Sequence, residues 1–301
     1  MRYTKKYDSS KTLSFFDIFL WQIKKKRLLP KENSNLHVKY EKEKLKIEDD
    51  FICWLGHASF LIQLDRKRIL LDPVFWDIPF YKRYIDMPYT IDKLGKIDYI
   101  FLSHIHYDLF DTKTLKQFKD KPVKFIVPLG VENYLKKIDK HFDIVSLDWY
   151  ESYANFTLTP AKHWNKRGIF DTNSALWGGV FIKGKKNTIF FSGDSAYEKH
   201  FQELSQSFSI DYALLPIGAY KPKQIMKHNH MDPKEALVAF QDLKAKYFIP
   251  MHYGTFRLSD EGINEPMQFL LQLPYDPKKT KLLLVGEVFG IMASKNKGSR
   301  C

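Results

Sequence analysis

The stretch DYIFLSHIHYD, residues 98–108, joins an apolar run to a group of metal-ligand side chains. Its first five residues are typical of a buried β-strand. His104 and His106 follow that run two positions apart, so in an extended segment both side chains point the same way. Imidazole nitrogen and carboxylate oxygen form the ligand set that suits zinc or iron, and Asp108 is placed to reach an adjacent ion. The stretch therefore predicts a metal site at the end of a strand.

Three further side chains of the same kind stand just beyond other strand-like runs. They are His163 after the run 156–159, Asp194 after TIFF at 188–191, and His252 after YFIPM at 247–251. A single histidine at such a place is more often a structural residue that one hydrogen bond satisfies. The whole set, in this order along the chain, favours one shared metal centre.

Short apolar runs recur along the chain and predict β-strands. They occupy residues 51–55, 59–64, 68–71, 98–102, 124–127, 156–159, 177–182, 188–191, 211–215 and 247–251. Helices are predicted over 114–118, 131–137 and 233–243, and Asp232 precedes Pro233 as the cap of the last one. Strands that come first and then mix with helices predict an α/β protein with two sheets and helices outside them.

The composition is that of a globular protein with one large domain. Of the 301 residues, 44% are hydrophobic and 28% are charged, which excludes a disordered chain. Only Cys53 and Cys301 are cysteines, so we expect no disulfide framework and a reducing, cytoplasmic location. The formal net charge of +13 predicts attraction to anions such as lipid headgroups or phosphorylated substrates, although scattered lysines serve solubility equally well.

We interpret residues 1–45 as an N-terminal arm, 46–290 as the main domain and 291–301 as a basic tail. Within the arm, LSFFDIFLWQI at 13–23 has apolar residues at roughly helical spacing and is followed by four basic residues. The segment is too short to span a membrane, and no cleavage site follows it. An amphipathic helix fits, which either docks on an anionic membrane surface or packs on the main domain.

SHIHYD resembles the HxHxDH signature of metallo-β-lactamase-fold hydrolases. More narrowly, the chain is similar to the branch that contains N-acyl-phosphatidylethanolamine-hydrolysing phospholipase D. The similar pieces follow one another as WLGHA at 54–58, LDPVF at 71–75, TIDKL at 90–94, HIHYDLFD at 104–111, PAKHW at 160–164, GDS at 193–195, PIGAY at 216–220, HMDPKE at 230–235 and HYGTF at 252–256. The resemblance implies an αββα four-layer sandwich with two zinc ions at one edge.

Carried over by position, the resemblance assigns the ligands of both ions. His104, His106 and His163 would hold the first ion, Asp108 and His252 the second, and Asp194 would bridge them. Iron or manganese is an alternative to zinc. Asp72 matches an aspartate that steadies the histidine loop, since a ligating imidazole needs an acceptor on its other nitrogen. His57 lies at a turn near the site, where a structural role is equally expected.

The residue after Asp108 departs from the family pattern. That pattern has a histidine there as a ligand of the second metal, whereas this chain has Leu109, which cannot ligate. Several outcomes remain open. The second site is weak, or water or a neighbouring side chain completes it, or the protein works with one metal, or it is an inactive relative.

Other side chains are assigned to the surroundings of the metals. The candidates are Asp108, Asp194 and His230 for catalysis, with His230 near the substrate, then Trp164 and Tyr220 for a substrate pocket, and Lys162 and Arg167 for contact with an anionic substrate. Packing is the alternative for the two aromatic residues, and a solvated position is the alternative for the two basic ones.

Three functions follow from these assignments. The first is a metal-dependent phosphodiesterase of the phospholipase D type, in which a metal-bound hydroxide attacks N-acyl-phosphatidylethanolamine or a small phosphodiester. The second is a lactonase or other carbonyl-ester hydrolase on the same site. The third is a metal-poor binding relative, motivated by Leu109. We expect a small-molecule or lipid substrate; the sequence does not fix the oligomeric state, for which a homodimer is one option, and no RNA-binding motif supports a nucleic-acid partner.

Overall fold

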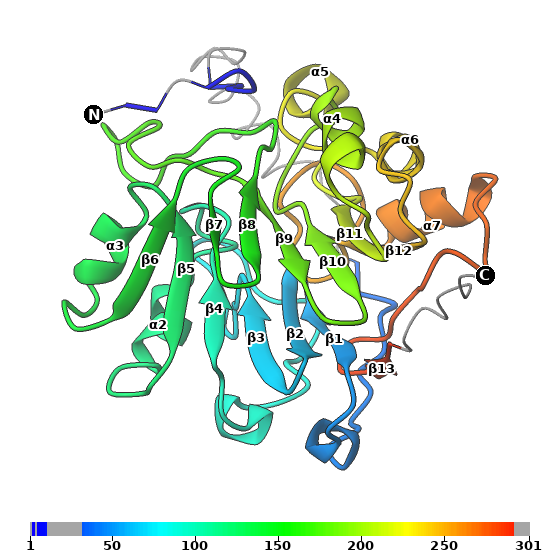
Figure 1. The fold of residues 1–301 in the computed structure, drawn as a ribbon. Coiled ribbons are helices and arrows are strands. Elements are labelled where there is room, and N and C mark those ends of the chain that lie inside the picture. The colour runs from blue at the N-terminus through cyan, green and yellow to red at the C-terminus, as the bar shows by residue number, and fades with distance from the viewer. Residues whose placement is uncertain (1, 4, 11–31, 292–301) are drawn as a thin grey trace, which may run out of the picture.

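Two β-sheets pack face to face with helices on their outer faces (Figure 1). The computed structural model describes residues 2–3, 5–10 and 32–291. One sheet has seven strands in the order β13-β1-β2-β3-β4-β5-β6, and the other has six in the order β12-β11-β10-β9-β8-β7. These layers confirm the predicted αββα sandwich.

The first sheet combines an antiparallel and a parallel half. Its strands are β1 (Phe51–Gly56), β2 (Ser59–Leu64), β3 (Lys67–Leu71), β4 (Tyr99–Phe101), β5 (Lys124–Pro128), β6 (Asp143–Leu147) and β13 (Val288–Gly290). Strands β13, β1, β2 and β3 pair antiparallel, and β3, β4, β5 and β6 pair parallel. The two 3₁₀ turns η1 (Lys44–Lys46) and η2 (Ile91–Leu94) lie in the segments that connect to this sheet. The strand before the histidines, β4, therefore lies inside the parallel half.

The second sheet has the same mixed character. Its strands are β7 (Ser152–Tyr153), β8 (Phe156–Thr159), β9 (Gly179–Lys183), β10 (Thr188–Phe191), β11 (Tyr212–Pro216) and β12 (Tyr247–Met251). Strands β7 to β10 form an antiparallel meander, whereas β10, β11 and β12 are parallel. Because β10 and β12 run in the same direction, the residues that follow them emerge at the same edge of the sheet.

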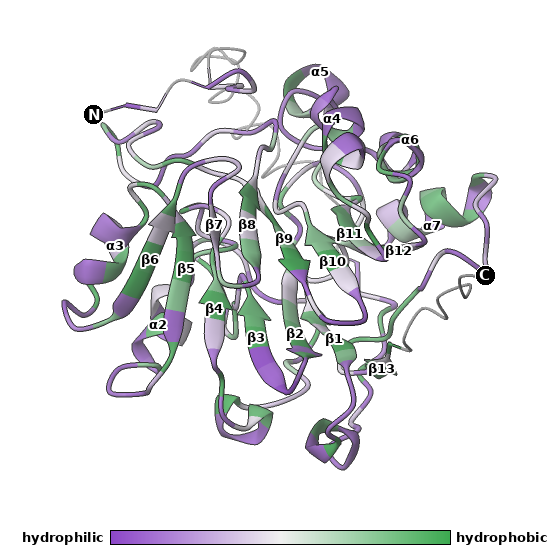
Figure 2. Ribbon diagram, in the orientation of Figure 1, coloured by the Kyte–Doolittle hydropathy of each residue, from purple (hydrophilic) through white to green (hydrophobic). Residues whose placement is uncertain are grey.

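Alternation along the strands builds two separate cores. In β1, Phe51 and Cys53 belong to the core under the outer helices of the first sheet, whereas Ile52 and Trp54 belong to the core between the sheets. Both faces of this strand are buried, and so its sequence is apolar throughout. Figure 2 shows the same hydrophobic character along most strands of both sheets.

Six helices are described, and their starts follow from their caps. They are α2 (Thr112–Lys116), α3 (Glu132–Lys136), α4 (His200–Ser207), α5 (Lys223–Met226), α6 (Pro233–Asp242) and α7 (Glu265–Gln272). Asp232 and Glu235 form a capping box at the start of α6, as the sequence predicted. Helix α2 begins two residues earlier than predicted, because Asp111 accepts hydrogen bonds from the backbone nitrogens of Lys113 and Thr114.

Replacing Asp111 with alanine is expected to lower the free energy of unfolding by about 1–2 kcal/mol. The change removes the acceptor of both orphan nitrogens and of the Thr114 hydroxyl. Urea denaturation followed by circular dichroism measures the loss. Lys116→Ala, at an exposed position of the same helix, is the control and should change stability little. An unchanged midpoint for Asp111→Ala would contradict the assignment of the cap.

The described part of the predicted arm packs on the main domain. The ring of Tyr7 packs at a tilt against the rings of Trp149 and His200, with centroids 6.0 and 5.2 Å away. The backbone nitrogen of Lys39 donates to the carbonyl of Val285 at 2.7 Å. The predicted amphipathic segment at 13–27 and the tail from residue 292 lie outside the described residues. None of the helices in the described part of the chain is long and apolar enough to cross a membrane.

Candidate metal centre

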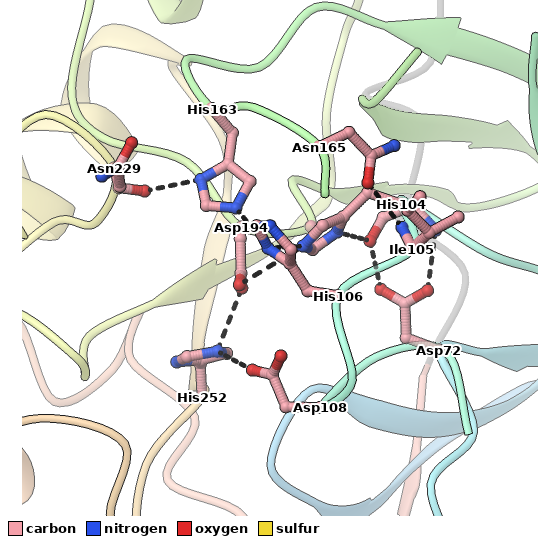
Figure 3. Close-up of polar contacts among 12 residues, drawn as sticks. Asp72, His104, Ile105, His106, Asp108, His163, Asn165, Asp194, Asn229 and His252 are labelled. Atoms are coloured by element: carbon pink, nitrogen blue, oxygen red, sulfur yellow. Dashed lines mark hydrogen bonds and ion pairs between the residues drawn. The ribbon is translucent and has the colours of Figure 1, made fainter. Parts of the chain in front are cut away.

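The six predicted ligand side chains meet at one place, although they come from four parts of the chain (Figure 3). Each of them lies in the connection that follows a strand. His104, His106 and Asp108 follow β4, His163 follows β8, Asp194 follows β10 and His252 follows β12. All six lie in the neighbourhood of the Asp194 carboxylate, which occupies the middle of the view in Figure 3.

Three histidines form the first group of the centre. The Nδ1 atom of His106 lies 2.9 Å from Nε2 of His104 and 3.1 Å from Nε2 of His163. Nδ1 of His163 donates to the carbonyl of Asn229 at 3.1 Å, so its Nε2 carries a lone pair. The Nε2 atoms of His104 and His163 are acceptors, and both face Nδ1 of His106. One proton shared among these three nitrogens cannot satisfy all of them. A cation placed among them would.

Two carboxylates and a histidine form the second group. Nε2 of His252 lies 3.3 Å from Oδ2 of Asp108 and 3.1 Å from Oδ1 of Asp194. The other oxygen of Asp194, Oδ2, lies 3.8 Å from Nε2 of His104 in the first group. The Asp194 carboxylate thus stands between the two groups, with one oxygen toward each.

Burial and neighbouring charge set the protonation of these residues. Burial, reinforced by His106, lowers the pKa of His104 to about 3, so this imidazole is neutral at pH 7. Burial also lowers the pKa of His252, but Asp194 and Asp108 outweigh it and raise that pKa to about 10. Burial raises the pKa of Asp108, yet hydrogen bonds to His252 and His57 hold it well below the usual value. Without a metal, a proton on His252 therefore offsets part of the carboxylate charge.

The donor set fits divalent metal ions. Neutral imidazole nitrogens and ionised carboxylate oxygens are the ligands of zinc and of related transition metals. The first group offers three converging nitrogens, and the second offers oxygens and a nitrogen whose proton a metal would displace. This chemistry fits a pair of ions that share Asp194, and it does not select zinc over iron or manganese.

A hydrogen-bonded chain holds the ring of His104. Ser103 donates from its backbone nitrogen to Oδ1 of Asp72 at 2.7 Å and from its hydroxyl to Oδ2 at 2.6 Å. The same hydroxyl oxygen lies 2.9 Å from Nδ1 of His104 and accepts a hydrogen bond from its N–H, which leaves the lone pair of Nε2 free. Asp72 therefore reaches the histidine through Ser103, a residue that was not singled out in the sequence although it stands next to His104.

Removing the Ser103 hydroxyl is expected to weaken zinc binding or turnover by about 10–100-fold. Ser103→Ala keeps the backbone bond to Asp72 but releases the orientation and tautomer of His104. Competition for zinc with a chromophoric chelator measures the affinity. Ser146→Ala is the matched control, because that hydroxyl only contacts Glu132 far from the metal centre. Equal zinc affinity in both variants would show that the chain of hydrogen bonds does not position the ligand.

Asn165 and Arg167, which both follow His163 in the chain, hold the histidine loop in place by hydrogen bonds. Asn165 accepts from the backbone nitrogen of Ile105 at 2.9 Å. Arg167 donates to the carbonyls of Ile105 and Phe110 at 3.0 and 2.9 Å, and its guanidinium stacks on Tyr107 at 4.3 Å. The sequence suggested that Arg167 would either contact an anionic substrate or be solvated. The structure shows neither position. The fixed fork of donors on Arg167 binds backbone carbonyls instead.

The remaining predicted residues take different positions. His230 lies with its ring centroid 5.3 Å from that of His163 and 5.4 Å from that of His252, at the centre. The rings of Trp164 and His106 form an edge-to-face pair with centroids 5.3 Å apart. The hydroxyl of Tyr220 donates to Glu265 at 2.9 Å. Lys162 pairs with Glu198, and His57 contacts Asp108.

Close packing of two turns brings the strand ends together. Gly193 has φ +59°, and a Cβ there would lie 2.7 Å from Cβ of Ser103. Only glycine allows the turn before Asp194 to come this near the turn before His104. His252 itself has φ +64°, a conformation that costs energy in a non-glycine residue and that recurs at functional sites.

A family model and two curated relatives match most of this chain. The family model for the Beta-lactamase superfamily domain matches residues 67–253. The chain is 31% identical over 268 residues to N-acyl-phosphatidylethanolamine-hydrolyzing phospholipase D 1 of Caenorhabditis elegans, an alignment that covers 79% of this chain and 75% of that protein. It is 34% identical over 239 residues to the mitochondrial protein of the same activity name in Saccharomyces cerevisiae. That alignment covers 73% of this chain and 51% of the yeast protein, so the match spans only about half of the yeast protein.

The fold is shared with solved structures of lower identity. A metallo hydrolase from the archaeon Ignicoccus hospitalis superposes with a TM-score of 0.63 at 22% identity. The superposition covers 81% of this chain and 99% of the archaeal one. At this identity the likeness concerns the fold.

Proposed function

Because the chain belongs to the β-lactamase superfamily domain family, and is a metal-dependent hydrolase of that fold, we propose that it is a phosphodiesterase of the phospholipase D type. Its substrate would be N-acyl-phosphatidylethanolamine or a similar phosphodiester. The observation that carries the proposal is the Asp194 carboxylate between two ligand groups, with oxygens 3.8 Å from His104 and 3.1 Å from His252. Two ions that share such a carboxylate make a clamp suited to in-line displacement at phosphorus.

The residues of the centre have two kinds of role, holding the metals and contacting the substrate. When bound, the metals supply Lewis-acid activation of water and of the phosphoryl oxygens. His104, His106 and His163 would hold one ion, Asp108 and His252 the other, and Asp194 would join them. We assign to His230, whose buried ring lies beside those of His163 and His252, contact with the substrate; burial lowers the pKa of this histidine to about 4, so the neutral ring would accept a proton from the attacking water.

Exposed apolar side chains beside the centre support a lipid substrate. Ile169 and Phe170 are 79% and 90% exposed, in the loop that Arg167 and Tyr107 tie to the histidine loop. Phe80, in the connection after β3, is 98% exposed. In the same connection, a backbone nitrogen donates a hydrogen bond to the carbonyl of Thr255. We propose that these three side chains together form a lipid-contact surface, because apolar side chains that gather on a surface mark an interaction site. Together with the net charge of +13 they suit an anionic lipid surface.

Replacing Phe80 and Phe170 with serine is expected to lower turnover of phospholipid in vesicles by about 100-fold or more, because each phenylalanine loses roughly 1.5–3 kcal/mol of burial in lipid. Turnover of a water-soluble phosphodiester should stay unchanged. Initial rates on both substrates give the comparison. Tyr40→Ser is the control, since Tyr40 is an exposed aromatic residue next to the segment that pairs with Val285. Equal losses on both substrates would mean that these side chains do not dock lipid.

A chelator-controlled assay tests the proposed activity. The purified protein is given N-acyl-phosphatidylethanolamine, a chromogenic phosphodiester and a panel of lactones. We expect release of phosphatidate and N-acylethanolamine, loss of turnover with chelator, and recovery on adding zinc. Absence of phosphodiester turnover with zinc, iron or manganese, or turnover that ignores the chelator, would reject the proposal. Faster turnover of lactones would favour carbonyl chemistry, and less than one bound metal per chain would favour a binding role.

A further inference from the structure

The position after Asp108 is closed to metal binding in this chain. The side chain of Leu109 is 0% exposed and belongs to the hydrophobic core between the two sheets. A ligand at this position would have to leave that core. Besides Asp108, His252 and the Asp194 carboxylate, a fourth protein ligand of the second ion would therefore have to come from another part of the chain.

His57 stands where that ligand is needed. It lies in the turn between β1 and β2, about 50 residues from the histidine loop, and its side chain is 1% exposed. Its Nε2 atom lies 3.0 Å from Oδ2 of Asp108, the same oxygen that Nε2 of His252 approaches at 3.3 Å. The rings of His57 and His252 have centroids 4.0 Å apart. The three ligand atoms lie within 4.8 Å of one another.

The backbone fixes His57 in this place. Its φ is +52°, in the left-handed region that a non-glycine residue adopts only under constraint. Three hydrogen bonds supply the constraint. The backbone nitrogen of His57 donates to Thr255 Oγ1 at 2.7 Å. Its carbonyl accepts from Trp54 Nε1 at 2.8 Å and from the backbone nitrogen of His252 at 3.0 Å. The last bond ties the backbones of the two histidines together. Strain held in this way at a cluster of ligand atoms indicates a functional geometry.

We propose that His57 is a ligand of the second metal and supplies the imidazole that Leu109 cannot. The inference rests on the proposed two-metal function. With His57, the second ion has two imidazole nitrogens, an Asp108 oxygen and an oxygen of the bridging Asp194. Four such donors match the tetrahedral preference of zinc. His57 thereby takes a direct role instead of the supporting one expected from the sequence.

Zinc stoichiometry of His57 variants tests this assignment. Each protein is dialysed against buffered zinc(II) and its metal content is measured by mass spectrometry. We expect two zinc ions per chain in the natural protein and one in His57→Asn, because asparagine accepts the left-handed backbone but removes the imidazole. The control is His200→Asn, since His200 is equally buried but its ring packs at a tilt against Tyr7 and Phe201, and this variant should keep both ions. Circular dichroism verifies the fold of each variant.

A cysteine at the same position gives a direct sign of ligation. Loaded with cobalt(II), His57→Cys is expected to show a thiolate-to-metal charge-transfer band, because a cysteine thiolate ligates such ions. This readout decides the matter if His57→Asn does not fold. Two tightly bound zinc ions in His57→Asn, a single zinc ion in the natural protein, or no such band would each overturn the inference.

The binding readouts need no substrate, so the inference and the proposed function can fail separately. A second zinc ion that depends on His57, without phosphodiester turnover, would reject only the function. Phosphodiester turnover together with a second zinc ion that ignores His57 would reject only the inference.

Discussion

Replacing Asp194 with asparagine is expected to lower kcat/KM by at least about 1,000-fold. The carboxylate is 3% exposed and has one oxygen toward each ligand group. An amide keeps its shape but is neutral, and its nitrogen cannot ligate beside the oxygen. Both metal positions lose a charged donor at once, so zinc content should fall together with turnover. Steady-state kinetics and metal analysis on the same preparation measure the two effects.

A buried aspartate outside the centre separates this effect from a general loss of stability. Asp211 is 6% exposed, pairs with Lys246 and accepts from Thr188, so Asp211→Asn disturbs a comparable set of bonds. We expect that variant to lose stability but to keep kcat/KM and both metals. Near-normal turnover in Asp194→Asn, with zinc still bound, would show that the carboxylate does not join the two ions.

The ligand positions could be predicted from the sequence because of where they stand along the strands. Apolar runs such as 98–102 and 188–191 mark buried strands, and a polar residue directly after such a run must lie at the edge of a sheet. Periodicity alone does not give the arrangement of the layers, and the αββα sandwich came from the family resemblance; the order of the strands within each sheet came only from the structure. The structure then brought all six side chains to one place.

Some elements carried too weak a pattern to be predicted. Strand β7 has two residues, and β6 is only half-buried, so neither shows a clear apolar run. Strand β13 pairs with β1 from the far end of the chain, and nothing local indicates that pairing. Helices α4, α5 and α7 were also missed; α4, for example, has few apolar residues, because only one of its faces packs on the core.

The residues that hold the ligands were missed for a different reason. Ser103, Asn165 and Asn229 are ordinary polar residues in the sequence, and only the fold shows that they bind a histidine or its loop. The one local signal was closeness to a ligand in the sequence, since Ser103 precedes His104 and Asn165 follows His163 by two residues. The loss of the family histidine at Leu109 was visible in the sequence, and the resemblance placed His57 near the site, but nothing in the sequence indicated its direct contact with Asp108.

Metal binding is expected to stabilise the folded protein strongly. With free zinc at about 1,000 times its dissociation constant, the free energy of unfolding should rise by about 4 kcal/mol per site, or roughly 10 °C in Tm for a domain of this size. The physical reason is the metal-free state itself, which buries the Asp108 and Asp194 carboxylates beside a cationic His252. Scanning calorimetry in excess chelator and in buffered zinc measures the difference.

Two variants distinguish stabilisation by zinc bound at the centre from unspecific effects of zinc on the protein. In Asp194→Asn the zinc-dependent rise in Tm should shrink, because the charge that favours the ions is reduced and the bridge is lost. In Ser146→Ala, whose hydroxyl lies far from the ligands, the rise should remain complete. The same Tm in chelator and in zinc for the natural protein would mean that the nitrogens and carboxylates of the centre do not bind metal in the folded state. The geometry of Figure 3 would then serve packing alone.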